Sequence, residues 1–136
     1  MEKQVLTSYM AHLTPEDLAI IEQLDQLIRT TAKVESYILT GMRNGSTEPM
    51  IGYHKNKSQL DHAPEERTFL IGLAKDSEEF KVYVNAVKHN RFLVNHYRDQ
   101  LGEVNVYSNT LAFRHLDQVD RVVFTEMIRE ACSLYS

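Results

Sequence analysis

The sequence of 136 residues is short of cysteine: it has one, Cys132, and a single cysteine cannot form an internal disulfide. A lone thiol is typical of proteins in a reducing compartment. Long hydrophobic runs are also missing. No segment approaches the ~20 apolar residues of a membrane span, and the first residues lead into no apolar run that would mark a signal peptide. We therefore expect one cytoplasmic domain, residues 1–136, without a membrane partner.

Glycine is scarce, and recognised catalytic patterns are absent. The five glycines stand singly, so the sequence has no glycine-rich phosphate loop. It also has no HExxH pair, CxxC pair or serine elbow, and we therefore do not predict an enzyme. The net charge of −4 argues against a nucleic-acid partner, because such proteins carry a strongly basic face. Five basic residues could form a local patch for an anionic ligand or be ordinary solvated side chains: Lys55, Lys57, Lys88, Arg91 and Arg98.

What the sequence does contain is a strong strand pattern around residues 68–84. Residues 68–74 are almost wholly apolar, residues 76–78 form a polar turn, and residues 80–84 alternate in polarity. The two runs predict a β-hairpin. Because the first run has no polar face, we place it centrally in a sheet, covered on both sides. The residues expected to be largely buried in this sheet are Phe69, Ile71, Phe80, Val82, Leu111 and Phe113.

Helix signals occur at three places. Thr14 is a typical N-cap, Pro15 suits the first turn, and apolar residues at helical spacing continue to about residue 31. A second helix is predicted over residues 87–101, because Leu93, Tyr97 and Leu101 fall four apart and Gly102 follows as a stop. A third helix should begin at Asp117 or Asp120. Its predicted buried stripe is Val123, Phe124, Met127, Ile128, Ala131 and Leu134.

Short strands are predicted at residues 34–39, 49–54, 104–107 and 110–113. Residues 41–46 read as a turn, and residues 55–67 as a long exposed loop. The order of elements lacks a regular βαβ alternation. We therefore predict an α+β fold, with a mainly antiparallel β-sheet flanked by about three helices.

Histidines are candidate metal ligands. His89 and His96 lie seven residues apart in the predicted second helix, where they would stand ~10 Å apart, too far to share one ion. His54 and His62 flank the polar loop beside several acids, a combination that suits iron or zinc but is also common in exposed loops. Cys132 lies close to the buried stripe of the last helix, where most cysteines behave as small hydrophobes.

Acids follow the predicted outward face of the first helix. This face carries Glu16, Glu22, Asp25 and Arg29, with Asp25 and Arg29 one turn apart. The simplest interpretation is a solvated helix face with a modest ion pair.

Four segments together resemble the YdhG-like domain, a bacterial family of mostly uncharacterised small proteins. The resemblance covers roughly residues 8–132 and rests on the order and spacing of the segments. This sequence departs from the family at Tyr107-Ser108, where relatives often carry a glycine-lysine pair, and at Lys55-Asn56-Lys57, where they carry a tyrosine-rich run. The four segments are the opening helix through Leu27-Ile28-Arg29, Met50-Ile51-Gly52-Tyr53-His54, the hairpin of residues 69–84, and residues 111–120 with the final helix.

The resemblance implies an antiparallel sheet flanked by helices, often compared with frataxin. One branch of the family is described as a frataxin-like iron chaperone that binds iron through surface acids. By that resemblance, Glu16, Glu22 and Asp25 are the candidate iron ligands here.

The resemblance also singles out Tyr53 and His54, which fall on the family's tyrosine-histidine pair. With Tyr83, they are the candidate residues for a small ligand. Neighbours in a strand point to opposite faces, so Tyr53 and His54 can share a pocket only where the strand twists or bulges. The alternative is that Tyr53 packs in the core while His54 meets water at the sheet edge. We expect a non-catalytic module for a small ligand or metal ion, iron included; the alternative is a protein-interaction or homodimerising domain.

Overall fold

The computed structural model describes residues 13–34, 36–39, 50–55, 69–75 and 79–134. Its centre is a six-stranded sheet in the order β1-β2-β3-β4-β8-β7. Every neighbouring pair in it is antiparallel. With helices packed on this sheet, the fold is α+β, as predicted. The strands are β1 Ser36–Leu39, β2 Met50–Lys55, β3 Phe69–Lys75, β4 Phe80–Val84, β7 Asn105–Tyr107 and β8 Thr110–Phe113.

The predicted hairpin is the middle of this sheet. β3 and β4 pair with Ile71 opposite Val84 and Leu73 opposite Val82. Residues 70–73 are all buried, so both faces of this part of β3 are covered. Of the six residues predicted to be buried, Ile71, Phe80, Val82, Leu111 and Phe113 are at most 2% exposed. The side chain of the sixth, Phe69, lies outside what the structure describes.

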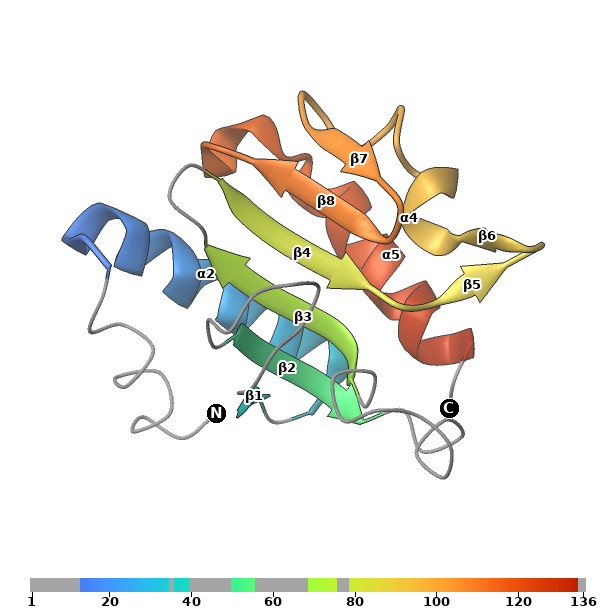
Figure 1. The fold of residues 1–136 in the computed structure, drawn as a ribbon, viewed down its shortest axis with the longest axis horizontal. Helices are drawn as coiled ribbons and strands as arrows, with labels where there is room; N and C mark the ends of the chain where they lie inside the picture. The colour runs from blue at the N-terminus through green and yellow to red at the C-terminus, as the bar shows by residue number, and fades with distance from the viewer. Residues whose placement is uncertain (1–12, 35, 40–49, 56–68, 76–78, 135–136) are drawn as a thin grey trace.

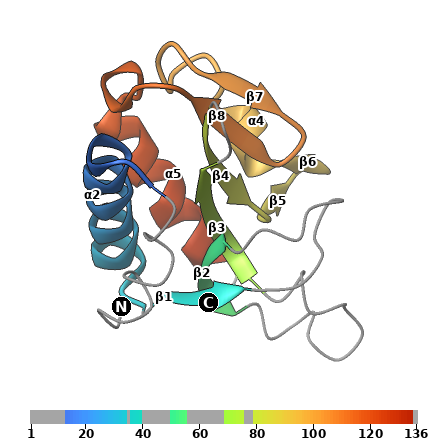
Figure 2. The ribbon, with the colours of Figure 1, turned by 60° about the vertical axis from the view of Figure 1, so that its left-hand side comes forward.

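Two long helices, α2 Pro15–Ala32 and α5 Arg121–Leu134, lie side by side on one face of the sheet (Figures 1 and 2). Thr14 caps α2 as predicted, because its Oγ1 accepts a hydrogen bond from the Asp17 N–H at 3.2 Å. Asp120, not Asp117, caps α5, since its Oδ1 accepts from the N–H groups of Val122 and Val123. The helix residues buried against the sheet are Ile21, Leu24 and Ile28 from α2 and Phe124, Met127, Ile128 and Ala131 from α5.

The prediction of a single helix over residues 87–101 is wrong. Its first part is a small hairpin, β5 Val87–Lys88 and β6 Arg91–Phe92, and only α4 Leu93–His96 is helical. His89 and Asn90 form the turn with φ angles of 54° and 64°, a left-handed pair that suits a two-residue hairpin. The Leu93 N–H donates to the Ala86 carbonyl at 2.8 Å and closes this unit. α4 then contacts both α5 and β7.

Some predicted features lie outside the described residues. They are the turn at residues 41–46, most of the loop at residues 55–67, including His62, and everything before residue 13. Within the described part of the chain, no helix has both the length and the apolar character to cross a membrane.

Candidate functional site

The structure does not bring the three predicted ligand residues together. Tyr53 is fully buried, and its hydroxyl donates to Asp25 Oδ1 of α2 at 2.7 Å, so it faces the helices. Tyr53 pairs with Ile71, whereas Tyr83 pairs with the next residue, Gly72. Tyr53 and Tyr83 therefore lie on opposite faces of the sheet and cannot line one pocket. His54 follows in β2, and its side chain is not described. The alternative prediction that Tyr53 packs in the core is therefore confirmed.

The predicted acidic face also needs a correction. Glu16 and Glu22 are exposed, but Asp25 is 1% exposed. Its Oδ2 accepts from Arg29 Nε at 2.9 Å, so the predicted ion pair exists, with its acidic end buried and its arginine partly exposed. A sequence signal was present: Asp25 falls within the stripe of Ile21, Leu24 and Ile28. Among the described residues, no three histidine, cysteine or acidic side chains are placed to hold a metal ion, and this includes the three acids.

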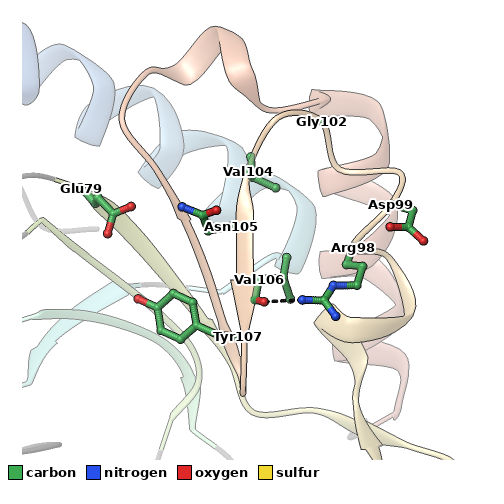
Figure 3. Close-up of a pocket in the computed structure, with 8 residues that line it drawn as sticks. All are labelled: Glu79, Arg98, Asp99, Gly102, Val104, Asn105, Val106 and Tyr107. Carbon is green, nitrogen blue, oxygen red and sulfur yellow. Dashed lines mark hydrogen bonds between the residues drawn. The ribbon is translucent and has the colours of Figure 1, made fainter.

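A hollow of about 570 Å³ lies instead at the free edge of the sheet, around β7. Figure 3 shows Glu79, Asn105 and Tyr107 on one side of β7 and Arg98 and Asp99 on the other, so the hollow wraps around the strand edge. Its lining is mostly polar and carries both signs of charge. The lining residues are Glu79, Arg98, Asp99, Gly102, Val104, Asn105, Val106 and Tyr107.

The edge of β7 is held by side chains that precede it in the chain. Arg98 Nη2 donates to the Val106 carbonyl at 2.7 Å, and Asn95 Nδ2 donates to the Ser108 carbonyl at 2.8 Å. These bonds occupy two backbone acceptors that an edge strand would otherwise present to another chain. They also fix the Arg98 guanidinium at the wall of the hollow (Figure 3). Tyr107 is 47% exposed there.

Sequence reasoning missed this site because it placed Arg98 on a long helix. Arg98 follows α4, and it can bond the edge strand β7 only because the chain turns back between α4 and β7.

A second polar cluster joins this region to α5. Lys88 Nζ binds Glu130 Oε2 at 2.6 Å, and the Tyr97 hydroxyl donates to Glu130 Oε1. Hydrogen bonds from Lys88 and then from Tyr97 hold the pKa of Glu130 below its ordinary value. Burial, together with the neighbouring Glu130, raises the pKa of Tyr97 to about 12. The cluster therefore carries an ionised carboxylate at neutral pH.

Two of the five residues of the predicted basic patch are engaged within the protein. Lys88 is paired with Glu130, and Arg98 is bonded to β7. Arg91 is exposed in β6, while Lys57 and the side chain of Lys55 lie outside what the structure describes. Among the members of this set that the structure describes, Arg98 lines the hollow at β7.

Comparison with protein-family models, with curated proteins and with solved structures found no match.

Proposed function

We propose that this protein is a non-catalytic small-ligand-binding module of the YdhG-like kind, and that the hollow at β7 is its binding site. The observation that carries the proposal is the Arg98 guanidinium, which is fixed by the Val106 carbonyl while it lines a polar hollow. The resemblance of four ordered segments to the YdhG-like domain supports the class of protein. The antiparallel sheet with two helices on one face agrees with what that resemblance implies.

The lining residues favour a small ligand that carries both an anionic group and hydrogen-bond donors. A guanidinium matches the geometry of a carboxylate or phosphate, and an arginine already held in place loses less side-chain entropy on binding. Asn105 can donate and accept, and Tyr107 offers a ring face and a hydroxyl. Glu79 and Asp99 add negative charge, which disfavours a polyanion and suits a ligand with an amino group. The volume lies within the range of small-molecule sites, roughly 300–1,000 Å³.

Iron binding through Glu16, Glu22 and Asp25 is not part of this proposal. Asp25 is buried and already bonded to Tyr53 and Arg29, so it cannot join exposed acids around an ion. The interaction-domain alternative also lacks a supporting observation. The exposed large apolar side chains of the described residues are Val87 in β5, Tyr107 in β7, and Val122 and Leu134 near opposite ends of α5, and their chemistry does not identify a partner.

The test is a thermal-shift screen followed by calorimetry. The panel contains free amino acids, dicarboxylates and nucleoside monophosphates, because these span the predicted chemistry. A native-state ligand raises the melting temperature. Its affinity should fall roughly tenfold or more in Arg98→Gln, the order expected from losing one charged hydrogen bond.

The matched control is Arg129→Gln, which removes an exposed arginine from α5 and should leave the affinity unchanged. Folding of both variants is checked by their melting temperatures without ligand. A panel that yields no binder, or a binder held equally well by Arg98→Gln, would show that the hollow is not the site.

A further inference from the structure

The hairpin of β5 and β6 brings two histidines together. His89 stands in its turn and His96 at the end of α4, with ring centroids 6.2 Å apart and ring planes at 68°. On the helix predicted for this segment, the same residues would be ~10 Å apart and unable to share an ion. The turn of His89 and Asn90 reverses the chain, so that β6 runs back along β5 and α4 follows it. His96 thereby reaches the carbonyl of Lys88, the residue before His89.

This separation suits two ligands of one metal ion. Metal–nitrogen bonds of ~2.0–2.1 Å place the centroids of two imidazoles on one ion about 5–6 Å apart, depending on the angle at the metal. The observed 6.2 Å lies just above that range. To enter that range the two rings must move closer together, and the His89 side chain is exposed, so neighbouring residues do not enclose it.

The hydrogen bonding of His96 also fits a metal ligand. Its Nε2 lies 2.8 Å from the Lys88 carbonyl oxygen, and because a carbonyl can only accept, Nε2 must carry the proton. In the neutral ring, Nδ1 then holds the lone pair that a metal needs. Metal-binding histidines commonly donate their other N–H to a backbone carbonyl, which fixes both the tautomer and the ring orientation. Here the carbonyl belongs to the residue directly before His89, so one hairpin positions both rings.

The charges around the pair do not oppose a cation strongly. The nearest ammonium, on Lys88, is paired with Glu130 at 2.6 Å. Glu130 is ionised at neutral pH and bonds Lys88, the residue directly before His89, so a negative charge lies near the hairpin that carries the pair. Arg91 is exposed and can extend into water.

The geometry points to a surface site for one imidazole-preferring divalent ion, Zn²⁺, Ni²⁺ or Cu²⁺, held by His89 and His96, with water as the remaining ligands. No third histidine, cysteine or acid among the described residues is placed to join them. The site is therefore open, and its affinity should be moderate.

Calorimetric titration with Zn²⁺ alone at neutral pH tests the site. The variants are chosen to keep the local structure. His89→Asn retains a residue that tolerates positive φ, and His96→Gln retains an amide donor for the Lys88 carbonyl. In each variant, one Zn²⁺-binding event should have an affinity at least ~10-fold lower than in the wild type. Loss of a group that only supports a metal ligand already lowers metal affinity by about this factor. The control, His115→Asn, removes an exposed histidine elsewhere and should bind as the wild type does.

Nitrogen NMR of the histidine rings gives a second reading on the unaltered protein. Saturating Zn²⁺ should shift the ring nitrogens of both His89 and His96. Melting temperatures in a chelator show whether each variant is folded. The inference is overturned by the absence of Zn²⁺ binding in the wild type, by unchanged affinity in either variant, or by ring signals of His89 and His96 that do not move.

Discussion

A carboxylate that is 1% exposed needs a partner for each oxygen, and Asp25 has both. The Tyr53 hydroxyl donates to Oδ1 at 2.7 Å, and Arg29 Nε donates to Oδ2 at 2.9 Å. Because the Arg29 side chain is 33% exposed, the positive end of this pair remains in contact with water. The arrangement ties α2 to β2 by a specific polar contact inside an otherwise apolar interface.

Replacing Tyr53 with phenylalanine should destabilise the protein by about 1–3 kcal/mol, because it leaves one oxygen of a buried carboxylate without its donor. Urea unfolding followed by circular dichroism measures this loss. Tyr107→Phe is the control: its ring is 47% exposed, and its unfolding free energy should stay within ~0.5 kcal/mol of the wild type. A Tyr53→Phe loss as small as that of the control would mean that the hydroxyl contributes nothing.

Gly102 is the second residue whose identity the fold demands. Its φ is +107°, and a Cβ at this position would lie 2.1 Å from the Gln118 carbonyl oxygen. Gly102→Ala should therefore cost roughly 1–3 kcal/mol or more, since both the backbone conformation and the contact with Gln118 are lost or strained. The neighbouring Glu103→Ala changes an exposed side chain and should be nearly neutral. Equal melting temperatures for the two variants would contradict the close approach.

Among the elements, α2 has the clearest start signal. Thr14 Oγ1 accepts from the Asp17 N–H, and Pro15, Glu16 and Asp17 complete the first turn. Thr14→Ala should lower the unfolding free energy by about 0.5–2 kcal/mol, as loss of an N-cap does. Thr30→Ala, an exposed change near the other end of the same helix, should be neutral or slightly stabilising because alanine favours helix. The melting temperatures of both variants distinguish the two explanations. A loss in Thr14→Ala alone indicates the N-cap, whereas equal losses would indicate a general effect of removing threonine.

The segment 87–101 shows why an element can be misread. Leu93, Tyr97 and Leu101 repeat every four residues, as helix positions do, but α4 keeps only residues 93–96 helical. His89 and Asn90 take left-handed conformations instead, and the Leu93 N–H bonds the Ala86 carbonyl across the hairpin. Packing against α5 and β7 selects this arrangement over a continuous helix.

For the molecule as a whole, the Lys88–Glu130 pair and the Tyr97–Glu130 bond connect the C-terminal helix with the β5–β6 region. Since the pKa of Glu130 is lowered from 4.5 in the folded state, its contribution to stability is fully present above pH 4.5. That contribution is lost as the pH falls below 4.5 and through the lower pKa of the folded protein.

We therefore expect Glu130→Gln to be less stable than the wild type at pH 7, with the difference shrinking as the pH falls below 4.5. Urea unfolding at several pH values measures it. Glu103→Gln, an exposed change elsewhere, should follow the wild type throughout. If the wild type stays more stable than Glu130→Gln by the same amount in acid, the ionised carboxylate is not the origin of the difference.

The candidate site could not be read from the sequence, for two physical reasons. Tyrosine is a residue type suited to a pocket, at position 53 as at position 83. The face of the sheet on which each side chain lies depends on strand register, which only the pairing with β3 defines. Arg98, Asn105 and Tyr107 come from segments that meet only because the chain turns back between α4 and β7. The sequence shows the types of these residues, but it does not show which of them lie close together in the folded protein.

Local patterns by themselves determined the central hairpin, both long helices and the short strands that follow residue 104. Caps and apolar periodicity act within a few residues, and so they can be recognised in the chain itself. Tertiary structure alone decided the bond between Tyr53 and Asp25, the division of residues 87–101, and the approach of His89 to His96. Each of these depends on which surfaces pack together, and packing free energy exceeds the small local preferences that a sequence pattern records.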